Sequence, residues 1–295
     1  MNKLIIKSDR LSLEIANPGK FPANTSRFDW SGFVTSIVLD GKYEFCTKEP
    51  TNLVHPSTGG EGLCNEYLYP ELCDTVKAGE KFPKFGIGLF EKPDDETFCF
   101  FRKYKVDPFP VKIKEEANVV TFITEPREEN VYKLVQEKRI EVQNNTVSMT
   151  VTLKNIGNVE ISMEEFCHNF LTIEKRPIGP RYHLEIPYLV HPYIKIGTLC
   201  GENGHLTFSD YNDKATLLQL DTASIGDKEL PYMWTLMHDD SPVYIKCFDD
   251  FKPAHLDVWS IDHIISVETF YPICLKPGEE KNWVRHWTFC VKGEE

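Results

Sequence analysis

The chain has 295 residues, of which 41% are apolar and 26% are charged, and its formal net charge is −12 at pH 7. This length allows one large domain or two ordinary ones with a sizeable buried core. The acidic balance argues against a surface that neutralises the phosphates of nucleic acid, so we expect no nucleic-acid partner.

Apolar and polar residues alternate along much of the chain, which is the pattern of half-buried strands. In NTVSMTVTLKN, for example, Val147, Met149, Val151 and Leu153 share one face, and turn residues flank the run. The same pattern predicts strands, in chain order, within residues 4–16, 32–46, 96–106, 118–125, 131–143, 145–158, 241–248 and 263–275.

The pattern lacks a long amphipathic helix and a low-complexity linker, so we expect an all-β fold in one domain that spans residues 1–295. The N-terminal apolar patch is interrupted by Lys7 and Asp9, and no run reaches the length of a membrane span. We therefore expect a protein of the cytoplasm without a membrane partner. The oligomeric state is not encoded in any pattern that we recognise.

The nine cysteines are scattered and form no CxxC pair, and the nine histidines show neither HxH nor HExxH spacing. Scattered single cysteines are typical of reduced, packed thiols in a reducing compartment. The sequence predicts that folding needs neither a metal nor a disulfide, and it contains no cofactor motif.

Two early loops carry residues that could contact a ligand. Arg27 lies in RFDWSG, where an arginine close to Trp30 is most often a surface cation–π pair. The stretch HPSTGGEGLCNEY leads through three glycines to Glu66 and lacks the form of a phosphate-binding loop. We interpret it as a loop that makes tight turns near a pocket.

The stretch EFCHNFLTI places His168 and Asn169 in a mostly apolar run. On a strand, His168 shares its face with Phe166 and Phe170, an arrangement that resembles the wall of a mostly apolar pocket. A core histidine with satisfied ring nitrogens is the ordinary alternative, and on this stretch alone it is favoured.

A carboxylate interrupts the late apolar run IISVETFYPICL at Glu268. Glutamate is rarely buried without a partner and is a poor strand residue. A functional carboxylate and a structural ion pair or edge position remain equal alternatives for Glu268 alone.

Several stretches resemble the aldose 1-epimerase (galactose mutarotase-like) superfamily. They are VTLKNIGNVEISMEEFCHNFLTI, ISVETFYPICLKPGEEKNWVRHWTF, RFDWSGFVTSIVLDGKYEF, and GGEGLCNEY followed by FGIGLFEK. The resemblance implies a large antiparallel β-supersandwich with a concave sugar-binding face. It also implies His168 as the catalytic acid and Glu268 as the catalytic base of an enzyme that interconverts the anomers of a free hexose.

We expect Arg27, Glu66, Asn169 and Trp259 to contact the small-molecule sugar. The rings of Phe166, Phe170 and Trp259 could stack on it, although ordinary core packing is the favoured alternative for any one of them. The sequence departs from the characterised mutarotases at His55, which Pro-Ser-Thr follows where those proteins have His-Gly-Gly, and it has no clear counterpart of their substrate-binding aspartate.

Two alternatives stay open. A hexose-phosphate epimerase of the same fold would need basic residues in the pocket, which Lys84, Arg102 or Arg181 could supply. A non-catalytic carbohydrate-binding protein would differ from an enzyme in whether His168 and Glu268 line one pocket and face each other across a space the size of a sugar.

Overall fold

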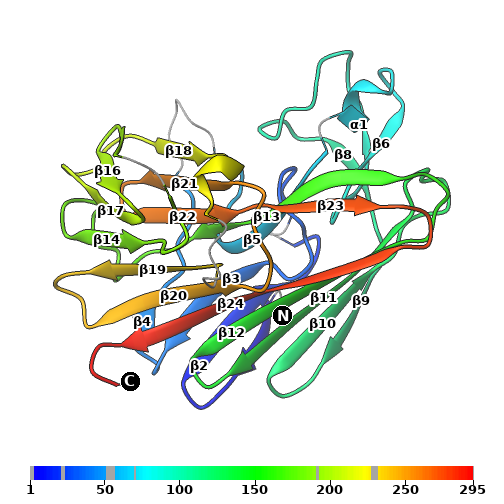
Figure 1. Cartoon of the computed structure of the whole chain (residues 1–295). Coiled ribbons are helices and arrows are strands. Elements are labelled where there is room, and N and C mark those ends of the chain that lie inside the picture. Colours follow the sequence, from blue (N-terminus) through cyan, green and yellow to red (C-terminus); the bar gives the residue numbers. More distant parts are fainter. Residues whose placement is uncertain are drawn as a thin grey trace.

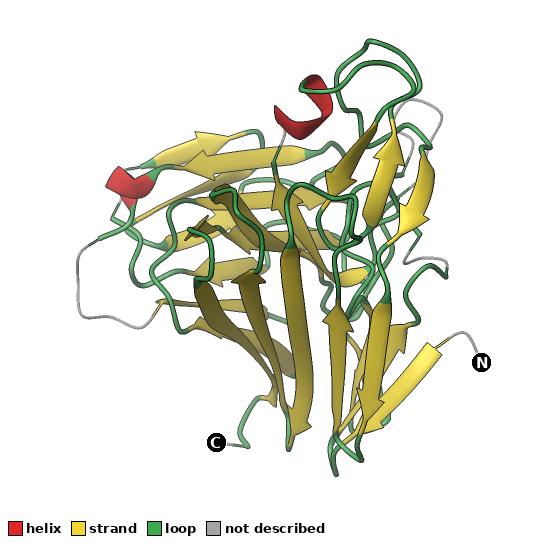
Figure 2. Ribbon diagram, turned by 90° about the vertical axis from the view of Figure 1, so that its right-hand side faces the viewer, coloured by secondary structure: helices red, strands yellow, loops and turns green. Residues whose placement is uncertain are grey.

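The computed structural model describes residues 3–20, 24–50, 57–69, 71–190, 193–226 and 232–294. Strands dominate these residues, and the helices among them are limited to one turn of α-helix, α1 (Glu71–Asp74), and a short 3-10 helix, η1 (Thr222–Ser224). Figure 2 shows both at the margin of the strands. Within the described ranges, no helix has the length and apolar character needed to cross a membrane.

The first of two large sheets has seven strands and contains the strand that carries His168. Its order is β1 (Lys3–Lys7), β2 (Leu11–Ala16), β3 (Val34–Leu39), β5 (Gly62–Leu68), β13 (Ile161–Phe170) and β23 (Tyr271–Leu275), with β4 (Tyr43–Glu44) paired to β3.

The second large sheet has eleven strands, which run from β16 at the upper left of Figure 1 to β9 at the right. Its order is β15 (Ile194–Ile196), β16 (Leu199–Glu202), β17 (His205–Phe208), β14 (Tyr182–Glu185), β19 (Tyr232–His238), β20 (Val243–Asp249), β24 (Glu280–Val291), β12 (Thr146–Asn155), β11 (Leu134–Gln143), β10 (Val119–Thr124) and β9 (Val111–Glu115).

Two three-stranded sheets complete the fold: β18 (Thr216–Leu220), β21 (Leu256–Ile261) and β22 (Ile264–Thr269), and β6 (Lys81–Lys84), β7 (Gly88–Glu91) and β8 (Lys105–Pro108). Every strand pair recorded in the described ranges is antiparallel. The expectation of a large antiparallel β-supersandwich is confirmed.

Strand β12 shows why alternation correctly locates a strand that has one buried face. Its apolar side chains, Val147, Met149, Val151 and Leu153, are all buried, whereas the residues between them face outward. The apolar face packs into the core between the large sheets, because a strand directs successive side chains to opposite faces.

The predicted strand over residues 96–106 is wrong. Residues 92–104 form a loop, and only β8 at its end is a strand. The aromatic side chains of this segment are placed by packing contacts and not by strand pairing. Phe98 stacks on Tyr104 at 5.4 Å between ring centroids, while Phe100 and Phe101 reach a cavity described below.

A buried charged network lies between the large sheets and fixes the loop that carries Arg27. The Lys138 ammonium, from β11, donates to Asp29 Oδ2 at 2.7 Å and to Asn65 Oδ1 at 2.7 Å, and neither Lys138 nor Asp29 has an exposed side chain. On β13, Glu165 accepts from Arg285 at 2.8 Å. Strand β13 therefore presents structural charges to the core and leaves its opposite face for other contacts.

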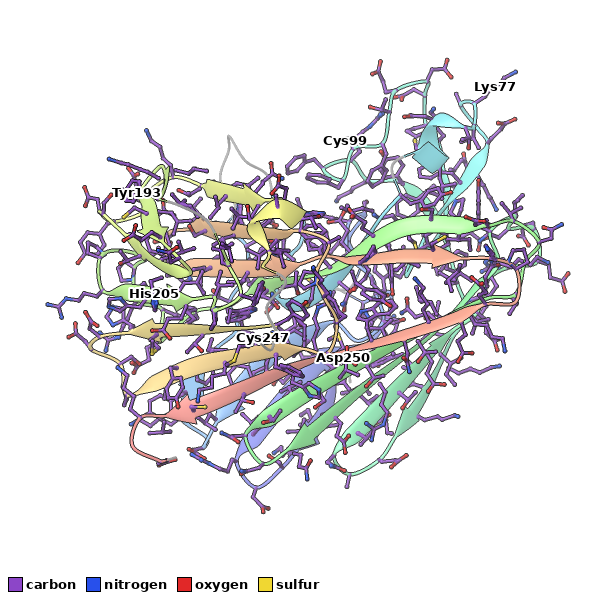
Figure 3. The ribbon with its side chains drawn as sticks, viewed as in Figure 1. Lys77, Cys99, Tyr193, His205, Cys247 and Asp250 are labelled. Carbon is purple, nitrogen blue, oxygen red and sulfur yellow. The ribbon has the colours of Figure 1, made fainter. Side chains whose placement is uncertain are left out.

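All nine cysteines are free thiols. They are spread across the molecule, as Cys99 on the loop after β7 and Cys247 on β20 illustrate in Figure 3.

Candidate active site

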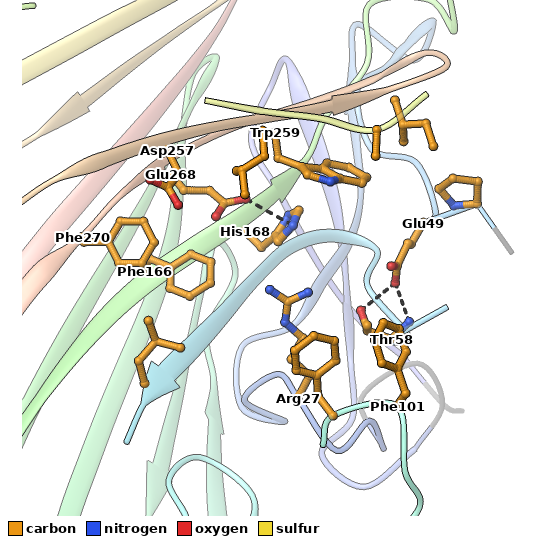
Figure 4. Close-up of a pocket in the computed structure, with 16 residues that line it drawn as sticks. Arg27, Glu49, Thr58, Phe101, Phe166, His168, Asp257, Trp259, Glu268 and Phe270 are labelled. Atoms are coloured by element: carbon orange, nitrogen blue, oxygen red, sulfur yellow. Dashed lines mark hydrogen bonds and ion pairs between the residues drawn. The ribbon is translucent and has the colours of Figure 1, made fainter. Parts of the chain in front are cut away.

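A cavity of about 360 Å³ opens on the face of β13 that carries His168 (Figure 4). Strands β13, β21 and β22 form its wall, and the loops that carry Arg27, Glu49 and Phe100 close its sides. Most lining side chains are apolar, which is typical of a small-molecule site. They are Pro50, Leu68, Phe100, Phe101, Phe166, Ala215, Leu217, Trp259, Ile261 and Phe270.

The β-ladder places Glu268 directly opposite His168. Strand β13 pairs with β23 so that Glu165 lies opposite Tyr271, and the isolated bridge between Leu171 and Ile265 continues the same register along β22. In this register position 168 faces position 268. Residues that are 100 positions apart in sequence thus become neighbours across adjacent strands, and His168 Nε2 lies 3.2 Å from Glu268 Oε1.

Asn169 is one of the residues that dock β22 on β13. Its amide Nδ2 donates to the Val267 carbonyl at 2.6 Å, and its backbone N–H donates to Ser266 Oγ at 2.9 Å. Because its side chain points away from the face that carries His168, the structure does not bring it to the cavity, and its position is that of a structural residue.

Aromatic rings hold the His168 imidazole in one plane. Phe170 stacks on it with ring centroids 3.9 Å apart and an interplanar angle of 6°, and Phe28 and Trp259 meet it edge-on at 5.8 and 5.3 Å. Only 4% of His168 is exposed, and no hydrogen-bond partner for its Nδ1 exists among the described residues. It is therefore not a core histidine with both nitrogens satisfied.

Burial governs the protonation of both groups. Burial lowers the pKa of His168 well below its ordinary value, and the positive charge of Arg27 lowers it further. Burial raises the pKa of Glu268 to about 8, against the opposing effect of Arg27 and helped by the negative charges of Asp257 and Glu66. At neutral pH the pair therefore retains one proton, with a neutral imidazole beside a carboxylic acid.

Arg27 lines the cavity, and Figure 4 shows its guanidinium directed toward the space in front of His168. Its Nε donates to Glu66 Oε2 at 2.7 Å, and its guanidinium carbon lies over the rings of Phe28 and Phe100 at 4.8 and 4.7 Å. The expected cation–π partner, Trp30, is replaced by these two rings, while the Trp30 indole donates to a backbone carbonyl.

Glu66 is not at the cavity surface. It is buried behind Arg27, where it also lies 3.6 Å from the Lys84 ammonium, so its position is that of an anchor for the guanidinium. Of the expected site residues, the structure brings His168, Glu268, Arg27 and Trp259 to one cavity and leaves Glu66 and Asn169 outside it.

The basic residues considered for a phosphate ligand do not converge on the cavity. Lys84 is buried beside Glu66, Arg102 pairs with Asp94, and Arg181 pairs with Asp240. Among the described lining residues, Arg27 is the sole cation, and it faces three carboxyl side chains, those of Glu49, Asp257 and Glu268.

The glycine-rich loop reaches the cavity through Thr58. Glu49 Oε2 accepts from the Thr58 backbone N–H at 2.7 Å and from its hydroxyl at 2.6 Å. Gly60 passes so close to Phe170 that a Cβ would lie 2.1 Å from its ring. Close backbone approach thus explains one glycine of this loop, which supports the ring stacked on the imidazole. His55 lies outside the described residues.

Asp257 is a site residue that the sequence analysis missed. It lines the cavity and pairs with Glu268 across the β21–β22 hairpin, whose two-residue turn is Asp262-His263. The signal was present in HLDVWSIDHIISVET. Two strand-like runs flank an Asp-His turn. Positions 257 and 268 lie equally far from that turn along the chain, so they pair across the hairpin.

Comparison with known proteins supports the fold. No protein-family model and no curated protein sequence matches the chain. Among solved structures, a galactose mutarotase related enzyme from Lactobacillus acidophilus aligns at 14% identity with a TM-score of 0.63 over 99% of each chain. A galactose mutarotase-like protein from Lactobacillus casei aligns at 15% identity and TM-score 0.59 over 98% of this chain and 100% of the other.

An aldose epimerase homologue from C. elegans aligns at 8% identity and TM-score 0.56 over 98% of each chain. These likenesses extend over nearly the whole chain, at identities that establish structure and leave activity open. The chain has the galactose mutarotase-like fold.

Proposed function

We propose that this protein interconverts the anomers of a free aldose, most simply a hexose, with Glu268 as general base and His168 as general acid. The observation that carries the proposal is the 3.2 Å contact between His168 Nε2 and Glu268 Oε1 at the wall of the cavity. The structural likeness to galactose mutarotase-like proteins and to an aldose epimerase homologue agrees with it.

The chemistry requires an acid and a base that are close together. Opening a cyclic hemiacetal removes the proton of the anomeric hydroxyl, breaks the bond between C1 and the ring oxygen, and protonates that oxygen. Both oxygens are bonded to C1, so the groups that serve them must be neighbours. The expectation that the two groups face each other across a space the size of a sugar is wrong, because His168 Nε2 and Glu268 Oε1 lie side by side, 3.2 Å apart. This arrangement lets both groups approach the C1 end of one sugar from the same side.

One proton on the pair is the right number for this reaction. An imidazolium beside a carboxylate has the same total charge as a neutral imidazole beside a carboxylic acid, so the single proton can be carried by either group. In the imidazolium–carboxylate form Glu268 accepts the proton of the anomeric hydroxyl, and His168 donates to the ring oxygen. After rotation about C1–C2, the opposite transfers close the ring on the other face. General acid and base contribute about 10²–10⁴-fold each.

The remaining lining residues suit a sugar. Arg27 supplies hydrogen-bond donors, while Trp259 and Phe166 offer aromatic faces to its C–H groups. A phosphorylated aldose fits this cavity less well, because Arg27 is already paired with Glu66 and three carboxyl side chains line the same space. No specific observation favours the hexose-phosphate alternative.

The proposal is tested by following mutarotation of freshly dissolved single anomers by polarimetry, across a panel of free and phosphorylated aldoses. We expect an acceleration proportional to protein concentration with at least one free aldose. Acceleration confined to phosphorylated sugars would refute the choice of substrate. Sugar binding without any acceleration would replace the enzyme by a carbohydrate-binding protein.

A further inference from the structure

Three titratable side chains form a row across adjacent strands. His168 on β13 faces Glu268 on β22, and Glu268 pairs with Asp257 on β21. All three line the cavity. Residues directly opposite in an antiparallel pair have Cβ atoms about 4.5–5.5 Å apart, so the Asp257 and Glu268 carboxyl groups are close neighbours on one face of the hairpin.

Asp257 is held on one side only. Its Oδ2 accepts from Gln219 Nε2 at 3.1 Å, whereas its Oδ1 is buried and has no hydrogen-bond partner in the part of the chain that the structure describes. No lysine or arginine forms an ion pair with Asp257 there. The basic group near it is His255, whose Nδ1 lies 3.8 Å from Oδ1.

His255 lies next to Asp257, on the side away from the cavity. Its Nε2 lies 3.2 Å from Glu164 Oε2, and its ring stacks on Phe270 at 3.8 Å between centroids with an interplanar angle of 21°. Phe270 itself lines the cavity, so His255 lies behind the aromatic wall. Both His255 and Glu164 are partly exposed, whereas Asp257 and Glu268 are buried.

We propose that Asp257 is a positioning residue which keeps the shared proton on the His168–Glu268 pair by placing a negative charge beside Glu268, and that His255 holds Asp257 in that place. This inference rests on the proposed function and adds to it a residue that acts through Glu268. A second carboxylate beside an acid makes loss of its proton unfavourable, and the reaction needs that proton.

The surrounding charges are consistent with this role. Arg27, from its loop, opposes Asp257 by favouring the ionised form of Glu268, and Glu66 on β5 acts in the same direction as Asp257. Asp257, followed by Glu164, raises the pKa of His255, which favours the imidazolium that an Asp257 carboxylate would bind. Arg27 is the strongest charge acting on Glu268, and Asp257 is the strongest of the charges that oppose it.

The test is a titration of His168 that requires no substrate. The imidazole signals of histidine-labelled protein are followed by NMR against pH, and His168 is identified by the signal lost in H168N. Because Glu268 lies 3.2 Å away, the His168 signal reports its ionisation, with an inflection expected at about pH 8. In D257N we expect this inflection about one pH unit lower.

Three further variants complete the design. D257E retains the charge and should titrate near the wild-type value, and D262N removes an exposed carboxylate from the turn of the same hairpin and should change nothing. D257S repeats the test if D257N does not fold, and failure of both to fold would overturn the proposal in favour of a structural role.

If the His168 signal of folded D257N has its inflection at the same pH as in the wild-type protein, the proposed role of Asp257 is overturned, even if mutarotation is observed. The opposite result separates the two proposals: a lowered inflection in D257N, without any mutarotation by the wild-type protein, would refute the proposed function and leave the electrostatic role of Asp257 standing.

Discussion

Replacement of Glu268 by glutamine tests both the chemistry and the electrostatics of the site. The amide preserves the shape of the protonated side chain and can still hydrogen-bond a hydroxyl, but it cannot exchange a proton at neutral pH. If Glu268 transfers the proton of the anomeric hydroxyl, kcat should fall by about 10²–10⁴-fold while sugar affinity changes far less.

The same substitution should stabilise the folded protein at alkaline pH. Folding raises the pKa of Glu268 from an ordinary 4.5 to about 8, so the folded state binds this proton more tightly than the unfolded state. The free energy of unfolding therefore falls as the pH rises from 4.5 through 8, by roughly 5 kcal/mol over the whole window. E268Q lacks this penalty, so its stability relative to the wild type should grow with pH over that range.

Two measurements on the same preparations decide the matter. Polarimetry gives the mutarotation rate per folded molecule, and urea unfolding at several pH values gives the stability difference. E268N serves as a matched control. It also replaces the carboxyl group by an amide, but its side chain is one methylene shorter and does not preserve the shape of glutamate. A wild-type rate in E268Q would show that Glu268 is structural. A stability difference that shrinks as the pH rises would contradict the raised pKa.

Three further outcomes are expected. The kcat/KM of the wild-type protein should fall about tenfold per pH unit above pH 8, because Glu268 loses its proton at about 8. It should persist below pH 6.5, because burial keeps the pKa of His168 low. A decline that begins well below pH 8 would contradict this. K138M should cost about 3–5 kcal/mol in urea unfolding by leaving the Asp29 charge buried and unpaired, whereas K112M, at an exposed ion pair, should cost less than about 0.5 kcal/mol. A chelator or a reductant should leave the melting temperature unchanged, since the nine cysteines are free and the described residues contain no cluster of metal-binding side chains; a large drop with either reagent would refute this.

Local sequence was most informative where a strand has one buried and one exposed face. Alternation identified β12 and its flanking turns because each side chain there has a single environment. It was misleading at residues 96–104, where the aromatic side chains serve packing and the cavity wall instead of a ladder. An aromatic run is compatible with either outcome, since stacking does not require strand geometry.

The candidate site was only partly accessible from the sequence. His168 and Glu268 were recognisable as polar residues in apolar runs, and both line the cavity. Asn169 and Glu66 look just as unusual in sequence, yet one docks β22 on β13 and the other anchors Arg27. Polarity in an apolar context marks a residue with a partner, and it does not say whether that partner is a ligand or the protein itself.

The sequence by itself determined the antiparallel β character and the faces of the strands whose residues alternate, because these depend on contacts between residues that are close along the chain. Only the tertiary structure decided that β22 lies beside β13 in the register that places Glu268 opposite His168. That register depends on contacts such as Asn169 to Val267 between distant segments, and a shift by one residue would turn Glu268 to the other face of the sheet.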